Sequence, residues 1–235
     1  MAASGAFLHA SLQGLTTFAP PREAALVELL DGRSGILVAI NAEKIARHDP
    51  AIAEVTSLHL GYPDGVGAVL ALRRRGIRAH RMPGADLWLT IIARYGIRRS
   101  FYLIGGTEEV IQAVAEKLTN QNPEMRLWTR NGYVSEGELQ HLEHELCSLR
   151  PDFVFVAMGS PKQEILMRRL YSIHPAVYVG LGGSFDIYAG TKSRAPRWLQ
   201  QIGLEGAYRL LREPRRLDQL PTLFRFVALL ATGRL

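Results

Sequence analysis

The sequence predicts an α/β fold built on a doubly wound parallel sheet with helices on both faces, followed by a C-terminal helical appendage. Three observations carry this prediction. Several runs, such as residues 153–157 (Phe-Val-Phe-Val-Ala), are apolar throughout, which is typical of strands buried on both faces of a parallel sheet. Glycine-rich turns follow these runs, and helical patterns follow the turns. From residue 191 the chain becomes basic and then apolar, so we expect a core over residues 1–190 and an appendage over 191–235.

The first half of the chain alternates short apolar runs with helical patterns. Asn41 stands where it can cap the helix that follows the first clear strand. Residues 59–67 hold a proline and three glycines, and we expect them to form a constrained loop. A basic run over 73–81 is expected to end one helix and pass into a short strand. The other expected elements are a strand or loop over 1–20, a helix over 22–30, a strand over 36–40 and helices over 41–53, 66–75 and 83–95.

The second half repeats a pattern of buried strand, turn and helix. Thr107 is expected to cap the helix that follows a Gly-Gly turn. Ser135 and Glu138 have the spacing of a capping box. Ser160 is expected as an N-cap, with Pro161 at the first helical position. The expected strands are 100–104, 125–129, 153–157 and 176–181. The expected helices are 110–119, 136–149, one that starts at residue 161, 197–202, 204–212 and one that lies within 218–235.

Length and composition describe a globular protein. With 235 residues, of which 47% are hydrophobic and 21% charged, the chain can bury a full core. The single cysteine, Cys147, excludes an internal disulfide and fits a reducing compartment. The chain shows neither a secretory signal pattern nor an uncharged apolar run of 18 residues, so we expect a cytoplasmic protein without a transmembrane helix. Since no metal-ligand motif stands out, we expect neither a metal nor a cofactor.

The net charge of +6 is concentrated in one segment. Residues 192–216 hold seven basic and two acidic residues, a net charge of +5, which leaves +1 for the rest of the chain. A local cluster of this kind points to an anionic partner, for which nucleic acid, lipid headgroups and a diphosphate are candidates. The apolar segment 218–235 that follows fits a helix in a membrane interface and a helix docked on protein equally well.

Polar and glycine residues follow the expected strands, at the sheet edge where open α/β folds bind ligands. Asn41 can bond a sugar or nucleoside there, or it can only cap its helix. Asp64 is the single carboxylate of its loop, although an Asp-Gly pair is often just a turn. Gly105-Gly106 lies between a strand and a helix, the arrangement of a phosphate cradle. Gly182-Gly183 forms a second glycine-rich turn after a strand.

Taken together, these stretches resemble the WecG/TagA/CpsF family of bacterial glycosyltransferases, roughly over residues 35–216. Each motif alone is weak, but all of them in one order are specific. The matching residues are Asn41, Pro63-Asp64-Gly65, Arg81 with Pro83-Gly84-Ala85-Asp86-Leu87, Gly105-Gly106, Asn131-Gly132-Tyr133, Pro151-Asp152, Gly159-Ser160-Pro161-Lys162-Gln163-Glu164, Gly182-Gly183-Ser184-Phe185-Asp186, Arg194-Ala195-Pro196-Arg197-Trp198, Gly203-Leu204-Glu205, Tyr208-Arg209 and Glu213-Pro214-Arg215-Arg216.

The resemblance implies a Rossmann-like core and an inverting transferase, peripheral at the inner face of the cell membrane. It implies a nucleotide-sugar donor, with a UDP-sugar of the N-acetylmannosamine or glucose type favoured, and an acceptor sugar linked to polyprenyl diphosphate. In this family the loop aspartate, here Asp64, is the proposed general base. C-terminal arginines, matched by Arg209 and Arg216, are thought to close over the diphosphate. The further positions expected to bind substrate are Asn41, Arg81, Asp86, Gly105, Gly106, Asn131, Gly159, Gln163, Glu164, Gly182, Gly183, Asp186 and Arg194.

Inverting transfer needs one base that takes the proton of the acceptor hydroxyl, and positive charge that stabilises the leaving diphosphate. Confinement of the Asp64 carboxylate is expected to raise its pKa and improve it as a base. No DxD pair ends a strand, whereas a basic segment exists, so we expect arginines in the place of a metal ion.

For such a transferase we expect no nucleic-acid partner, and the sequence leaves open whether the chain forms a homo-oligomer. The alternative is a nucleotide- or nucleic-acid-binding regulator that uses the basic segment. A dinucleotide oxidoreductase is disfavoured because no GxGxxG follows a strand.

Overall fold

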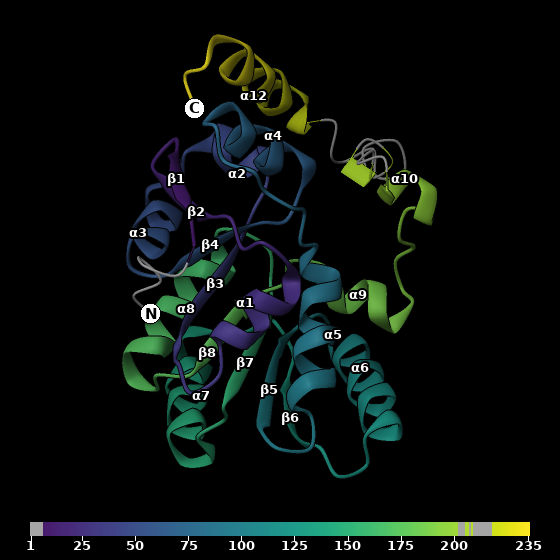
Figure 1. The fold of residues 1–235 in the computed structure, drawn as a ribbon. Coiled ribbons are helices and arrows are strands. Elements are labelled where there is room, and N and C mark those ends of the chain that lie inside the picture. The colour runs from purple at the N-terminus through teal and green to yellow at the C-terminus, as the bar shows by residue number, and fades with distance from the viewer. Residues whose placement is uncertain (1–6, 202–204, 207, 209–217) are drawn as a thin grey trace.

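One mixed sheet runs through the part of the chain that this computed structural model describes, residues 7–201, 205, 206, 208 and 218–235 (Figure 1). Its strands lie in the order β1-β2-β4-β3-β8-β7-β5-β6, and every neighbouring pair is parallel except β1 with β2. The strands are β1 His9–Leu12, β2 Leu15–Phe18, β3 Gly35–Ile40, β4 Leu60–Pro63, β5 Ser100–Gly105, β6 Arg126–Arg130, β7 Phe153–Ala157 and β8 Val177–Gly180.

Helices cover both faces of this sheet, and most of them follow a strand directly (Figure 1). The helices are α1 Glu23–Leu29, α2 Ala42–Arg47, α3 Pro50–Leu58, α4 Val66–Arg74, α5 Gly84–Tyr95, α6 Glu108–Gln121, α7 Glu136–Leu149, α8 Lys162–Ile173, α9 Ser184–Ala189, α10 Arg197–Gln201 and α12 Leu220–Thr232.

Side chains of the central strands alternate between two apolar layers, as they do in strands buried on both faces. In β7, Val154 and Val156 pack into the layer that contains α2, α3, α4, α7 and α8. Phe153 and Phe155 of the same strand pack into the opposite layer, with α1, α5 and α6. The predicted α/β fold, with a mostly parallel sheet, helices on both faces and a C-terminal helix, is therefore confirmed.

The crossover connections that leave the neighbouring strands β5 and β7 lead toward opposite edges of the sheet. From β5 the chain passes through α6 to β6 at the margin of the sheet, whereas from β7 it passes through α8 to β8 near the centre. In open parallel sheets, ligands bind outside the carboxyl ends of the strands at such a change of direction. The Gly105-Gly106 turn ends β5 and Gly159 follows β7, so both turns border this position.

Two helical segments, residues 41–53 and the segment after Ser160, differ from the sequence-based expectation in their caps or their division. Residues 41–53 form two helices, because His48 takes a left-handed conformation with φ of 51° and Pro50 then starts α3. Asp49 caps that second helix through its side chain. The prediction of Ser160 as an N-cap was wrong, because α8 begins one residue later than expected and Pro161 is its N-cap residue.

The caps predicted for three other helices are confirmed. Asn41 Oδ1 accepts a hydrogen bond from the Lys44 backbone N–H at 3.0 Å, and the Thr107 hydroxyl caps α6. A reciprocal capping box of Ser135 and Glu138 starts α7. These confirmed caps show that local polar patterns located the helix starts well.

The loop expected over residues 59–67 instead contains strand β4, which is buried along its whole length. A Cβ atom on Gly61 would lie 2.4 Å from the Thr16 carbonyl oxygen, so this glycine lets β2 and β4 approach each other. Asp64 therefore directly follows a central strand. The short strand expected after the basic run is absent from residues 75–83, where Met82 N–H makes a single hydrogen bond to Pro63 O at 2.8 Å.

The C-terminal helix α12 lies against α2 and α4 (Figure 1). Its Phe226 is buried, and the neighbouring Gly67 leaves room for the ring because a Cβ atom there would lie 3.2 Å from it. Leu223, Phe224 and Val227 of the same helix are exposed. Among the described residues, no helix is both long enough and apolar enough to cross a bilayer. The boundary between core and appendage at residue 190 stays a prediction.

A buried histidine at the amino-terminal edge of the sheet is expected to make the fold acid-sensitive. His59 packs edge-on against Tyr171, and its Nδ1 is buried without a hydrogen-bond partner among the described residues. Burial lowers the pKa of His59 to about 4 from the ordinary value of 6.5. The unfolded chain therefore binds the extra proton between these values, so the free energy of unfolding is unaffected above pH 6.5 and falls as the pH drops toward 4.

We expect this loss to amount to about 1–3 kcal/mol. Chemical denaturation between pH 4 and pH 7 measures it, and in His59→Phe the loss should shrink within that window. His141→Phe serves as the control because His141 is exposed. Equal pH dependence of the His59 variant and the natural protein would contradict the prediction.

Candidate active site

The parallel strands bring most of the predicted site residues to one edge of the sheet. Strand register places Ile40 beside Pro63 and Gly105 beside Ala157, so the segments that follow β3, β4, β5 and β7 emerge together. The predicted residues found at this edge are Asn41 after β3, Asp64 after β4, Gly105 and Gly106 at the end of β5, Asn131 after β6, Gly159, Gln163 and Glu164 after β7, and Gly182 and Gly183 after β8.

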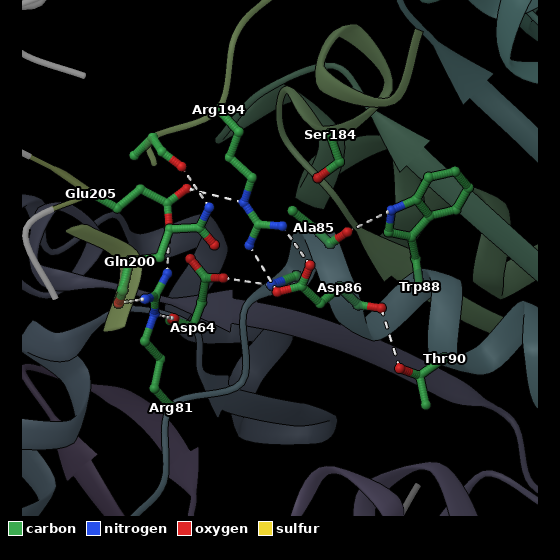
Figure 2. Close-up of polar contacts among 12 residues, drawn as sticks. Asp64, Arg81, Ala85, Asp86, Trp88, Thr90, Ser184, Arg194, Gln200 and Glu205 are labelled. Carbon is green, nitrogen blue, oxygen red and sulfur yellow. Dashed lines mark hydrogen bonds and ion pairs between the residues drawn. The ribbon is translucent and has the colours of Figure 1, made fainter. Parts of the chain in front are cut away.

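Asp64 is held in place by main-chain contacts. Its backbone N–H donates to Ile40 O at 3.0 Å, and its Oδ1 accepts from the Gly84 N–H at the start of α5 at 2.6 Å (Figure 2). No described residue forms an ion pair with its carboxylate or a hydrogen bond to Oδ2. Burial raises the pKa of Asp64, and the Gly84 hydrogen bond and the Arg81 charge oppose this only in part. The raised pKa makes this carboxylate a stronger proton acceptor, and the described residues leave its Oδ2 without a hydrogen bond.

Three predicted residues gather beside Asp64 in a cluster of charges (Figure 2). Arg81 donates from Nε to the Asp64 main-chain oxygen at 3.2 Å and forms an ion pair with Glu205. Arg194 grips Asp86 with both terminal nitrogens, Nη2 lying 2.8 Å from Oδ2, and its Nε lies 3.6 Å from Glu205 Oε1. Glu205 therefore bridges two arginines. Hydrogen bonding and ion pairing with Asp86 raise the pKa of Arg194 further above its usual value.

A buried ion pair lies behind the turns that follow β3 and β8. Lys44 Nζ lies 2.7 Å from Glu164 Oε1, and the two side chains are 9% and 0% exposed. Gln163 Nε2 donates to the same Glu164 oxygen at 2.9 Å, and its Oε1 accepts from the Gly182 N–H at 2.9 Å. Burial would raise the pKa of Glu164, but the Lys44 charge and the hydrogen bonds from Lys44 and Gln163 hold it below its usual value. The Gln163 amide thus connects the Glu164 carboxylate to the Gly182 turn.

The glycine turn after β5 allows a close contact between backbones. A Cβ atom on Gly105 would lie 2.4 Å from the Ala157 carbonyl oxygen, at a φ of +152° that favours glycine. The Gly132 N–H donates to Gly106 O at 2.9 Å, which joins the loops after β5 and β6. Asn131 donates to Glu108 Oε2 at 2.8 Å and accepts from the Tyr133 N–H at 3.0 Å. The Asn131 side chain therefore stabilises its own loop and joins it to the start of α6.

The remaining predicted residues have different surroundings. Asn41 uses Oδ1 for its helix cap, and its Nδ2 has no partner in the described part of the chain. Asp186 in α9 pairs with Lys192 at 3.3 Å, and no described contact joins it to the cluster around Asp64. Arg209 and Arg216 lie outside the described residues.

Sequence reasoning missed several residues of the site. Glu205 was noted within the matching Gly203-Leu204-Glu205 motif but was not expected to take part in the site, and Lys44 was not singled out on its helix. Gln200 also contributes, because its carbonyl oxygen accepts from Arg81 Nη1 at 2.7 Å. Each acts through partners far away in the chain, so no local pattern announces it. One usable signal was the acidic Glu205 in a segment that is otherwise strongly basic.

Comparison with known protein families adds one finding to this geometry. A family model for glycosyl transferases of the WecG/TagA/CpsF type matches residues 14–235. The match extends on both sides of the residues that carry the motif resemblance. Among the described residues, no group of three or more His, Cys, Asp or Glu side chains is placed to hold a metal ion.

Proposed function

The chain belongs to the WecG/TagA/CpsF family of glycosyl transferases, and from this premise we propose that it is an inverting transferase with Asp64 as the general base. The family places the enzyme in cell-surface polysaccharide biosynthesis, with a nucleotide-sugar donor and a lipid-linked acceptor in general. The proposal refines these to a UDP-sugar of the N-acetylmannosamine or glucose type and a sugar on polyprenyl diphosphate. Because the family consists of enzymes, the alternative of a nucleic-acid-binding regulator is not carried forward.

The environment of Asp64 is the observation that supports this role best. A general base must be ionised when it meets the acceptor hydroxyl, yet bind a proton firmly during transfer. Burial raises the pKa of Asp64 toward such a value, and its carboxylate forms no ion pair with any described residue. Its position after β4 sets it at the edge where Asn41 and the glycine turns also emerge.

The proposed reaction is a single displacement. The acceptor hydroxyl oxygen attacks the anomeric carbon of the donor sugar while Asp64 takes the hydroxyl proton. The bond between that carbon and the diphosphate oxygen breaks on the opposite side, and its electron pair leaves with the nucleotide diphosphate. The anomeric configuration is therefore inverted, and negative charge grows on the leaving diphosphate.

We propose that arginines, rather than a metal ion, stabilise the negative charge on the leaving diphosphate. In the described cluster, the two positive charges of Arg81 and Arg194 are balanced by Asp86 and Glu205. Additional cations are needed for a diphosphate, and the basic segment supplies Arg209 and Arg216. The exposed apolar side chains of α12 would bring the enzyme to the membrane surface where its acceptor is anchored.

A donor screen tests this function. Purified enzyme is incubated with UDP-N-acetylmannosamine or UDP-glucose and a short-chain prenyl-diphosphate sugar, with and without EDTA. We expect transfer from one donor, inverted configuration of the new bond by NMR, and an unchanged rate in EDTA. Retained configuration would contradict the single displacement, and activity that EDTA removes and Mg²⁺ restores would contradict the role of the arginines.

A further inference from the structure

We propose that Glu205 is a positioning residue, which holds the Arg81 guanidinium away from the Asp64 carboxylate and thereby keeps the base free of an ion pair. The inference rests on the proposed role of Asp64 and deepens it. It concerns a carboxylate of the basic segment to which neither the charge pattern nor the motif resemblance gave a role.

The contacts of Arg81 show how its charge is directed. Each of its three guanidinium nitrogens has a partner: Nε donates to Asp64 O, Nη1 to Gln200 O and Nη2 to Glu205 Oε2 (Figure 2). None of them reaches the Asp64 carboxylate, although Nε lies 3.2 Å from the main-chain oxygen of that same residue. Where a guanidinium and a carboxylate meet in space, they form a strong, frequently bidentate pair. Glu205 occupies the nitrogen that would otherwise be available.

A second arginine, Arg194, lies on the other side of Glu205. Arg194 Nε lies 3.6 Å from Glu205 Oε1, and the terminal nitrogens of Arg194 are held by Asp86. The Glu205 side chain is only 14% exposed, so water weakens these interactions little. The Glu205 carboxylate thus lies between two arginines: it accepts a hydrogen bond from Arg81 and forms a longer ion pair with Arg194.

The charges around Asp64 fit this arrangement. Burial raises the pKa of Asp64, whereas the Gly84 hydrogen bond, Arg81 and Lys44 lower it and Glu205 raises it. Two of the neighbouring charges are already engaged, because Lys44 is paired with Glu164 and Asp86 with Arg194. The groups that act on Asp64 from the surrounding elements are Tyr62 on β4, Lys44 on α2, Arg81 before α5 and Glu205. Figure 2 also shows Asp86 on α5 and Arg194 after α9 beside Asp64.

Loss of the Glu205 charge would act on Asp64 in two ways. A negative charge near the carboxylate disappears, and Arg81 Nη2 is released to pair with Asp64. Both changes favour the ionised form and lower the pKa of Asp64. A base with a lower pKa takes the acceptor proton less readily, and an occupied carboxylate has fewer free lone pairs for the acceptor hydroxyl.

The pH profile of kcat/KM in Glu205→Gln tests the inference. We expect the acidic limb, where the base becomes protonated, to move to lower pH, and the plateau rate to fall several-fold. In Glu205→Gln with Arg81→Gln, the Arg81 guanidinium can no longer occupy Asp64, and the acidic limb should return toward that of the natural enzyme. Glu136→Gln, which alters an ion pair whose carboxylate side chain is 84% exposed, is the matched control. A slower enzyme with an unmoved limb would mean that Glu205 only docks its segment, and would overturn the inference.

A titration that does not depend on activity separates this inference from the proposed function. Carboxyl NMR signals of isotope-labelled aspartates, with Asp64 assigned through Asp64→Asn, give its pKa in the natural protein and in Glu205→Gln. A lower pKa of Asp64 in the variant supports the positioning role, even if Asp64→Asn proves active and the base lies elsewhere. An unchanged pKa of Asp64 overturns the positioning role, whatever the base is.

Discussion

Asp64→Asn is expected to lower kcat by about 10²–10⁴-fold, the range that loss of a general base usually causes. Asparagine has the same shape and its amide oxygen can keep the 2.6 Å hydrogen bond from the Gly84 N–H, so the loop should stay in place. The amide cannot take the acceptor proton, however. Binding of UDP should therefore remain within a few-fold of the natural enzyme by calorimetry, while transfer to the prenyl-diphosphate sugar is lost.

Asp31→Asn is a matched control for this change. The Asp31 side chain is 65% exposed, and its contact with Arg99 is long at 3.5 Å. This variant should transfer sugar at the natural rate. Near-natural turnover in Asp64→Asn would remove Asp64 from the role of base, whereas loss of UDP binding together with turnover would point to a collapsed loop.

Lys44→Met is expected to lower the free energy of unfolding by about 3–5 kcal/mol, because it leaves a buried carboxylate without its cation. Glu164 is fully buried, and its Oε2 already has no hydrogen-bond partner among the described residues. Methionine fills similar space but cannot replace the ammonium group or its hydrogen bond to Ala39 O at 2.8 Å. Urea denaturation at pH 7 measures the change.

The pH dependence of this variant gives the sign of the effect. In the natural protein the pKa of Glu164 is lowered, so its stabilisation is present above the unfolded pKa and is lost as the pH falls through the folded pKa. Without Lys44, burial dominates and raises the pKa of Glu164. The deficit of Lys44→Met should then grow as the pH rises above the unfolded pKa and shrink in acid.

Two further variants check that account. Glu164→Gln added to Lys44→Met should recover part of the lost stability, because no buried charge remains. Arg168→Met breaks an ion pair with Glu54 whose side chains are 45% and 54% exposed, and it should cost less than about 1 kcal/mol. A loss as small in Lys44→Met would contradict the importance of the buried pair.

The elements that the sequence predicted well are those whose pattern is local. Phe153–Ala157 is apolar at every position because it is buried on both faces, and that is visible without any partner strand. Asn41, Thr107 and Ser135 cap helices through contacts with residues three positions away. Leu60–Pro63 could not be predicted in this way, because its strand conformation depends on the space that Gly61 leaves beside Thr16. The split of residues 41–53 could have been read from Asp49-Pro50, a helix-start signal inside the expected helix.

In the candidate site, too, the residues that could be predicted differ from the contacts that could not. Asp64, Arg81, Asp86 and Arg194 were expected from the family resemblance, and the structure brings these four together. Their contacts could not be foreseen, because the partners are distant in the chain. Glu205 pairs with Arg81 across 124 positions, and Lys44 with Glu164 across 120. Such pairings leave no periodic trace in the sequence.

The place of β8 has a consequence for how the protein is made. This strand is the last of the sheet to be synthesised, yet it lies between β3 and β7, in the middle of the order. Until about residue 180 has left the ribosome, the half carrying Asn41 and Asp64 has no partner strand through which to join the half carrying Gly105 and Gly159. A nascent chain that lacks β8 can therefore form at most two separate half-sheets, and we expect substrate binding to require the insertion of β8.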